Sequence, residues 1–246
     1  MIGEIFLICF FAFLLGGAGL YWASRTANTA TRRSRGKKFA TYLLLVHVVL
    51  VSALLGRVML VAFFAAIVTV GAVELFRVLY SSHLARFSYP LRIAAGYFTA
   101  SLLLLAFVFN ATPQEVIFAY LIVAAFDGFS QVAGQLAGQL VGTHPLANQI
   151  SPSKTIEGAI GGFCAAVVMS LAVRGLVGLN IGRSVVACTA ITAAALTGDL
   201  LASWVKRKGG VKDFGRVLPG HGGALDRFDS FLFAGPVYLL LLHLKF

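Results

Sequence analysis

The segment KRKGGVKDFGRVLPGHGGALDRFDS combines residue types that bind phosphate groups and metal ions. Its charged side chains are Lys206, Arg207, Lys208, Lys212, Asp213, Arg216, Asp226, Arg227 and Asp229. Glycines such as Gly222 and Gly223 let backbone N–H groups approach phosphate oxygens. Carboxylates can hold Mg²⁺, which in turn binds phosphates. We therefore interpret the segment as a site for a nucleoside triphosphate and metal ions. The alternative is a solvated loop with incidental salt pairs.

Two neighbouring side chains extend this candidate site. Asp199 ends an apolar run, and a carboxylate at that depth takes up a proton unless a cation lies beside it. The alternative is an aspartate that reaches water from a helix end. His221 stands between glycines, where it could act as a general base, bind phosphate or shape the turn. We favour the last two roles, because a phosphate nucleophile is already ionised at neutral pH.

Upstream, the stretch ISPSKTIEG suggests a second anion-binding element. Ser151 followed by Pro152 predicts a helix start, with the serine oxygen as cap and proline at the first helical position. N–H groups at a helix N-terminus favour anions, and Lys154 adds a full charge. A plain capped helix is the alternative. The glycines of GQLAGQLVG (residues 134–142) predict a helix-packing face rather than a phosphate cradle.

The C-terminal half resembles the phosphatidate cytidylyltransferase family, also called CDP-diacylglycerol synthases. The residues in register with that family's signature are Ser203, Val205, Lys206, Arg207, Lys212, Asp213, Gly215, Leu218, Pro219, His221, Gly222, Gly223, Asp226, Arg227, Phe228 and Asp229. The resemblance extends upstream to Gly198–Asp199, to SPSKTIEG and to Asp127. Two positions depart from the pattern: Ala224 replaces a larger aliphatic residue, and Ala202 stands where the family usually has Glu.

The resemblance implies an enzyme that joins CTP to phosphatidate, forming CDP-diacylglycerol and pyrophosphate. Mg²⁺ would be the cofactor, with a second, monovalent cation such as K⁺ allowed beside it, and Asp199 and Asp226 would be the metal ligands. Lys206, Arg207, Lys212 and Arg227 would neutralise phosphates, while Asp213 and Asp229 would support the metal, a base or the loop. The substrate-binding candidates are Asp127, Ser151, Lys154, Thr155, Ser203, Gly222 and Gly223. The resemblance also allows a homodimer.

The elements that carry these residues must cross a membrane. Of the 246 residues, 59% are hydrophobic and only 12% are charged, and the apolar runs are continuous rather than alternating, which disfavours a β-barrel. We predict an all-α, polytopic bundle of about eight transmembrane helices, with residues 1–114 as N-terminal helices and 115–246 as the catalytic region, including a cytoplasmic loop at 203–230. The predicted spans are 3–24, 40–56, 58–76, 93–110, 115–133, 156–174, 184–202 and 230–244.

The charge distribution predicts the orientation of this bundle. Sixteen of the twenty Lys and Arg residues fall on the side that carries the Lys206–Ser230 segment. Such a bias marks the cytoplasmic side, so we expect the site to face the cytoplasm of a bacterial inner membrane. The net charge of +11 then reports orientation and attraction to anionic lipid rather than nucleic-acid binding.

Three other functions are compatible with parts of the pattern. A CTP-dependent lipid-alcohol kinase would transfer the γ-phosphate instead of CMP. A catalytically altered paralogue is suggested by Ala202. A transporter would also place ionisable residues in helices, but transporter sites lie near the bilayer midplane, whereas these charges gather toward one face.

Overall fold

The computed structural model describes residues 2–25, 27–81, 89–215, 217 and 222–244. Within these ranges the chain forms eight α-helices, a short 3₁₀ helix and a two-stranded hairpin. The elements are α1 (Ile2–Ala23), α2 (Thr29–Leu54), α3 (Arg57–Ser81), α4 (Tyr89–Asn110), α5 (Pro113–Leu140), β1 (Pro145–Ala147), β2 (Ser151–Thr155), α6 (Ile156–Val173), η2 (Arg174–Leu176), α7 (Ile181–Lys208) and α8 (Leu225–His243). The all-α prediction is confirmed.

Seven helices of the described chain, α1 to α7, are long and apolar enough to cross a membrane. The eighth helix, α8, has 19 residues, but its first turns carry Asp226, Arg227 and Asp229. The prediction of a polytopic helical bundle is therefore confirmed. The described part of the chain has seven candidate spans and one further apolar helix whose start is charged.

Several helices extend past the predicted spans. α2 begins at Thr29, where the Asn28 side chain accepts the Thr31 N–H at 2.8 Å, so most of the segment between the predicted spans 3–24 and 40–56 is helical. α7 continues to Lys208 and α8 begins at Leu225, which reduces the predicted loop 203–230 to residues 209–224. Hydropathy marks only the part of a helix inside hydrocarbon, whereas helical hydrogen bonding continues into the headgroup region.

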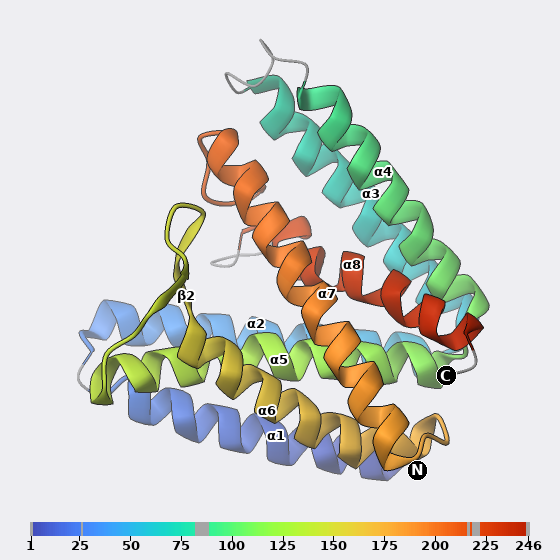
Figure 1. The fold of residues 1–246 in the computed structure, drawn as a ribbon, viewed down its shortest axis with the longest axis horizontal. Coiled ribbons are helices and arrows are strands. Elements are labelled where there is room, and N and C mark those ends of the chain that lie inside the picture. The colour runs from blue at the N-terminus through green and yellow to red at the C-terminus, as the bar shows by residue number, and fades with distance from the viewer. Residues whose placement is uncertain (1, 26, 82–88, 216, 218–221, 245–246) are drawn as a thin grey trace.

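The helices form two groups joined by α7 and α8 (Figure 1). Among the seven candidate spans α5 is the most enclosed, with every residue from 116 to 126 buried, and it contacts α1, α2 and α6. α3 and α4 pack on each other and on α8. Aromatic rings fill that second interface, where Phe231 of α8 packs against Phe64 of α3 and Phe107 of α4.

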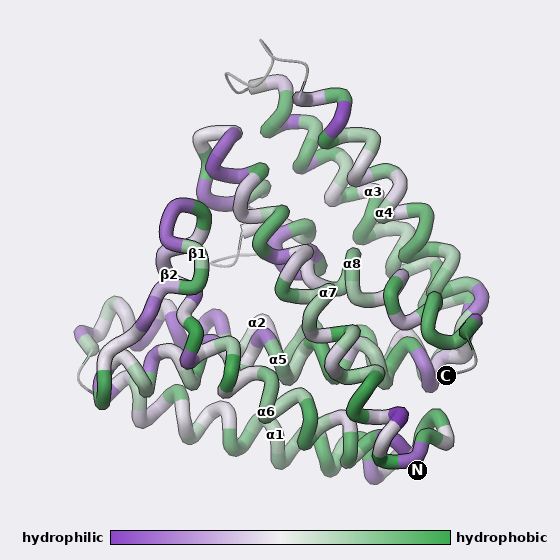
Figure 2. Tube along the Cα trace, in the orientation of Figure 1, coloured by the Kyte–Doolittle hydropathy of each residue, from purple (hydrophilic) through white to green (hydrophobic). Residues whose placement is uncertain are grey.

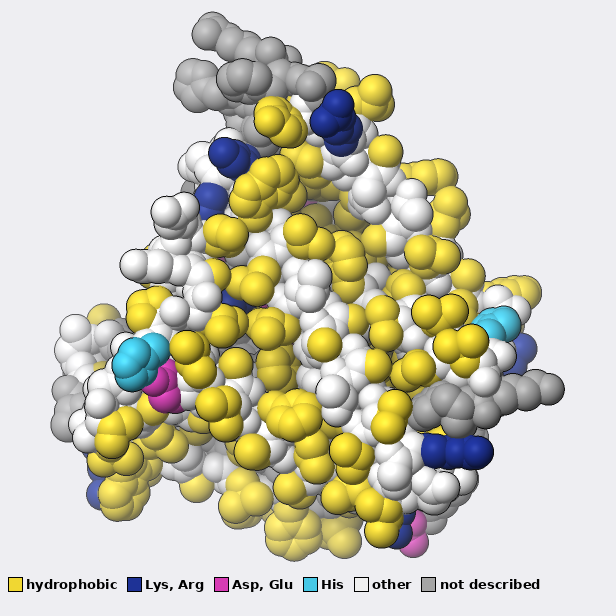
Figure 3. All heavy atoms as spheres, viewed as in Figure 1, with side chains coloured by type: hydrophobic (Ala, Val, Ile, Leu, Met, Phe, Trp, Pro, Cys, Tyr) yellow, Lys and Arg dark blue, Asp and Glu magenta, His cyan; other side chains and the backbone are white. Residues whose placement is uncertain are grey.

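Large apolar side chains remain exposed around the bundle, including Phe10, Leu91, Phe98 and Val168. Hydrophobic side chains cover much of the face shown in Figure 3. A water-soluble protein rarely leaves such continuous apolar surface. Together with the candidate spans, this surface identifies an integral membrane protein.

Small residues bring α5 and α6 into close contact. A Cβ built on Gly134 of α5 would lie 2.9 Å from the Thr155 hydroxyl and 3.6 Å from the Gly158 Cα. A Cβ on Gly162 of α6 would come 2.5 Å from the Phe126 carbonyl oxygen. The predicted packing role is thus confirmed for Gly134. Gly142 lies just beyond α5 with a φ of 86°, a conformation that favours glycine.

The prediction of a helix start at Ser151 is wrong. Residues Ser151–Thr155 form strand β2, and α6 begins at Ile156. Thr155 is the N-cap, and its side-chain oxygen accepts the Gly158 N–H at 3.0 Å. Both Ser151 and Thr155 can cap a helix, and the sequence pattern alone does not include the pairing of this segment with β1.

Candidate active site at the polar end of the bundle

Three elements bring polar residues to one end of the bundle. Figure 2 shows hydrophilic residues on the β1–β2 hairpin, on the C-terminal turns of α7 and at the start of α8. The hairpin is distant in sequence from α7 and α8 but in contact with them in space, since β2 touches α7 and α7 packs along α8. The predicted site residues that the structure describes lie on these elements, on the loop 209–224 and on α5.

The best-defined interaction of the site joins α7 to α8. Lys206 Nζ lies 2.8 Å from Asp226 Oδ1 and 3.8 Å from an Asp229 oxygen, and all three residues are buried. The second oxygen of Asp226 accepts the backbone N–H groups of Phe214 at 2.8 Å and Gly223 at 2.9 Å. Asp226 therefore holds Lys206 and two separate points of the loop, Phe214 and Gly223, at once.

Glycine at position 222 is required by this arrangement. Gly222 has a φ of 82°, and a Cβ there would lie 2.8 Å from Asp226 Oδ2 and 3.1 Å from Asp213 Cβ. The neighbouring Gly223 donates its N–H to Asp226. In this structure, then, these glycines allow the backbone to approach a carboxylate, in addition to the approach to phosphate that the sequence predicts.

A second cluster contains three carboxylates from three helices. Asp127 of α5, Asp199 of α7 and Asp229 of α8 lie close enough to interact electrostatically. Asp127 accepts a hydrogen bond from the Ser230 hydroxyl. Lys154 of β2 forms an ion pair with Asp199, which attaches the hairpin to α7. Like charges at short range repel, so such a cluster favours binding of cations.

The other basic candidates surround this cluster. Arg227 is exposed, and its positive charge acts on both Asp127 and Asp229. The Arg207 side chain donates to the carbonyl oxygens of Ile150 and Val211, each at 3.3 Å, and so connects α7 to the hairpin and to the loop.

The remaining candidates differ in exposure. Lys212 and Asp213 are exposed on the loop, whereas Ser151 and Ser203 are buried. Thr155 serves as the helix cap described above. His221, which the sequence identifies as a candidate for phosphate binding or turn structure, lies outside the described residues.

Glu74 of α3 also belongs to this region, although it lies outside the motifs that predict the site. It is 2% exposed, and its carboxylate accepts the N–H groups of Ala224 at 3.0 Å and Leu225 at 2.9 Å. The available signal was an isolated carboxylate within an apolar span, which is costly unless it is bound.

The carboxylates suit a magnesium ion only if a substrate supplies further oxygen ligands. Within the described ranges, no three His, Cys, Asp or Glu side chains meet closely enough to hold a metal ion. Mg²⁺ is commonly bound by one or two carboxylates plus phosphate oxygens and water. Asp199 and Asp229 have the donor chemistry for that mode. Asp226 already accepts three N–H donors, which leaves little capacity, so its role as a ligand stays a prediction.

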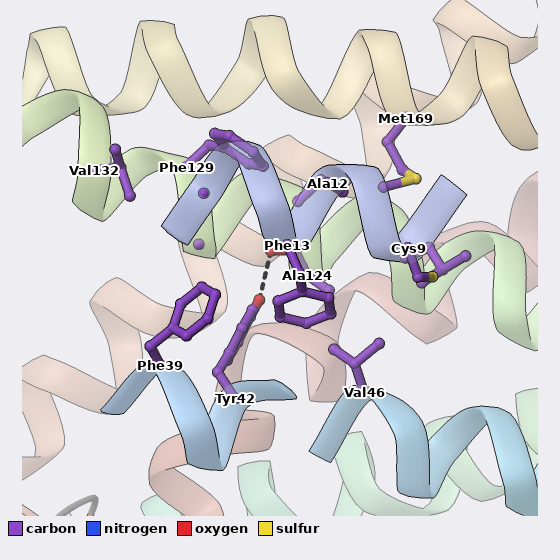
Figure 4. Close-up of a pocket in the computed structure, with 14 residues that line it drawn as sticks. Cys9, Ala12, Phe13, Phe39, Tyr42, Val46, Ala124, Phe129, Val132 and Met169 are labelled. Carbon is purple, nitrogen blue, oxygen red and sulfur yellow. Dashed lines mark hydrogen bonds between the residues drawn. The ribbon is translucent and has the colours of Figure 1, made fainter. Parts of the chain in front are cut away.

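An apolar pocket lies between α1, α2, α5 and α6, and its lining includes Gly128, the chain neighbour of Asp127. It has a volume of about 540 Å³ including the part open to its surroundings, and side chains such as Phe13, Phe39, Val46 and Met169 line it (Figure 4). The Tyr42 hydroxyl donates to the Ala124 carbonyl oxygen at its edge. This lining does not suit a nucleotide, so the polar end of the bundle is the candidate active site.

Comparisons with known proteins find relatives that match about half of the chain. A phosphatidate cytidylyltransferase of Staphylococcus epidermidis is 43% identical over 131 residues, 52% of this chain and 49% of that protein. One of Staphylococcus aureus is 42% identical over 129 residues, covering 52% and 48% respectively. The chain thus spans about half the length of the curated relatives it matches. The model of the cytidylyltransferase family matches residues 85–245, which hold all the predicted site residues, and the chain therefore belongs to that family.

Proposed function

We propose that the protein transfers CMP from CTP to phosphatidate, giving CDP-diacylglycerol and pyrophosphate. The observation that carries this proposal is the convergence of Lys154, Lys206 and Arg227 on the carboxylates of α5, α7 and α8. Family membership and relatives named phosphatidate cytidylyltransferase support the choice of substrates.

The reaction requires two anions to meet. A phosphate oxygen of phosphatidate attacks the α-phosphorus of CTP, and pyrophosphate leaves from the opposite side. No protein nucleophile is needed, so the protein contributes positioning and charge neutralisation. Lys154, Lys206 and Arg227 would bind and orient the phosphates of the two substrates. The buried pair between Lys206 and Asp226 holds that lysine in a defined position.

The carboxylate cluster is the proposed place for Mg²⁺, with Asp199 and Asp229 as ligands and Asp127 beside them. When bound, Mg²⁺ supplies neutralisation of the negative charge on the transferring phosphate. Asp226 then acts mainly by holding Lys206 and the loop, since its oxygens accept three N–H donors. A second, monovalent cation stays a prediction.

The location of the site suits one lipid and one water-soluble substrate. The charged elements stand at the end of apolar helices, so phosphatidate can enter from the membrane while CTP enters from water. The positive-inside bias supports a cytoplasmic orientation in a bacterial inner membrane. No nucleic acid is required as a partner, because the charge is accounted for by lipid attraction and phosphate binding.

The decisive experiment is an assay of the purified protein with phosphatidate, Mg²⁺ and CTP labelled at the α-phosphorus. Label recovered in a lipid that comigrates with CDP-diacylglycerol supports the proposal. Label that enters lipid only from γ-labelled CTP identifies a lipid kinase instead. Solute flux across liposomes without nucleotide, combined with no lipid labelling, would establish a transporter.

A further inference from the structure

Glu74 is the feature of the site that the proposed chemistry does not use. It lies on α3, and its two carboxylate oxygens accept separate backbone N–H groups at the start of α8. Asp226, Arg227 and Asp229 follow Ala224 and Leu225 directly in the chain. Glu74 therefore binds the backbone that immediately precedes three candidate site residues.

The loop also closes around the Glu74 carboxyl group. A Cβ built on Gly215 or on Gly223 would lie closer than 3.0 Å to that group, so the loop passes against it at these two positions, where it carries no side chain. Gly223 in addition donates its N–H to Asp226. A single glycine thus contacts Glu74 and Asp226, and a shift of one carboxylate displaces the other.

We infer that Glu74 is a positioning residue that sets the place of the α8 N-terminus and, through it, of Asp226, Arg227 and Asp229. This inference rests on the proposed function. A carboxylate suits the position for two reasons: it offers an oxygen to each N–H donor, and its negative charge favours a helix N-terminus. Glutamine has only one carbonyl oxygen, so its NH₂ group would face a donor.

The position of Glu74 in the chain has a consequence for the catalytic half of the protein. The family match covers residues 85–245, and Glu74 lies before that region. The catalytic half would therefore depend on α3 for the placement of its own charged residues. A contact between residues 150 positions apart provides that dependence.

The test compares E74Q and E74D with wild type. The matched control is E115Q, because Glu115 also accepts backbone N–H near a helix start, through Thr112 at the beginning of α5, away from the site. Purified full-length proteins are assayed for kcat and for KM toward CTP. A second readout needs no activity: the rate of tryptic cleavage after the exposed Lys212, followed by mass spectrometry.

We expect E74Q to raise the KM for CTP and to lower kcat, each by about tenfold or more, because small misplacements of catalytic groups are costly. Cleavage after Lys212 should accelerate. E74D keeps the charge, so its kcat, KM and cleavage rate should lie between those of E74Q and wild type. If E74Q does not fold, E74D provides the test. E115Q should match wild type.

Loss of stability alone would lower the amount of active enzyme but leave KM unchanged. Wild-type KM and wild-type cleavage in the folded variants would overturn the inference. If the wild-type protein forms no CDP-lipid, the proposed function fails instead. The cleavage comparison would then still test the positioning role of Glu74.

Discussion

Lys206 of α7 and Asp226 of α8 form a buried ion pair, with 2.8 Å between Nζ and Oδ1. The pair joins the last turn of one helix to the first turn of the next across the loop 209–224. Asp226 is not only the partner of Lys206, because its other oxygen accepts two backbone N–H groups. The two members of the pair are therefore not equivalent, and substitutions can reveal this.

Charge reversal should not rescue this pair. D226N leaves Lys206 without its closest partner, and breaking a buried pair costs about 3–5 kcal/mol of folding free energy. We expect loss of CDP-lipid formation and a lower melting temperature in detergent. The exchange K206D/D226K restores opposite charges but leaves the Phe214 and Gly223 N–H groups facing a cation. Activity of the exchanged variant near wild type would show that the backbone contacts of Asp226 are dispensable.

Asp199 should affect catalysis more than stability. Its pair with Lys154 is about one-quarter exposed, with side-chain accessibilities of 21% for Lys154 and 27% for Asp199. Pairs exposed to solvent contribute about 1 kcal/mol or less, and loss of the Asp199 charge also relieves its repulsion of Asp127 and Asp229. We expect D199N to keep its melting temperature within a few degrees while kcat falls by about 100-fold, since a group that neutralises transition-state charge is lost. A large loss of stability with normal kcat per folded molecule would contradict this role.

Most of the candidate site could be predicted from the sequence, because its motif residues are close together in the chain. Lys206 and Asp226 are 20 positions apart, and the glycines between them indicate a loop that brings them together. Apolar runs likewise located the spans, since burial in lipid demands them. The charged ends of α2, α7 and α8 could not be placed, because hydropathy does not report helical structure outside the hydrocarbon.

Sequence patterns do not predict contacts between segments that are distant in the chain. In the sequence, Glu74 is a single acidic residue within an apolar run. Only the fold shows that it binds the start of α8. The same reason explains the wrong helix start at Ser151. Its local pattern suits a cap, but the pairing of β2 with β1 moves the cap to Thr155.

Alanine substitutions at two glycines of the loop distinguish the effect of backbone strain from the effect of displacing a site residue. Gly222 and Gly210 have φ values of 82° and 69°, and alanine in that conformation costs about 1–2 kcal/mol at each. A Cβ on Gly210 meets nothing within 4 Å, whereas one on Gly222 lies 2.8 Å from Asp226 Oδ2. We expect G210A to retain most activity and G222A to lose about tenfold or more. Equal kinetics of the two variants would show that displacement of Asp226 is unimportant.

The contact between α5 and α6 can be tested through stability alone. A Cβ on Gly162 would come 2.5 Å from the Phe126 carbonyl oxygen, so α6 must move away from α5 in G162A. We expect a loss of about 1–3 kcal/mol, the usual effect of overpacking. Gly96 of α4 provides the control, because a Cβ there meets nothing within 4 Å. G96A should keep the wild-type melting temperature in detergent, whereas G162A should melt several degrees lower.

Because α6 begins directly after β2, which carries Lys154, G162A should also weaken the attachment of the hairpin to Asp199 and reduce CMP transfer. If G162A melts like G96A, the two helices are not in close contact along this face.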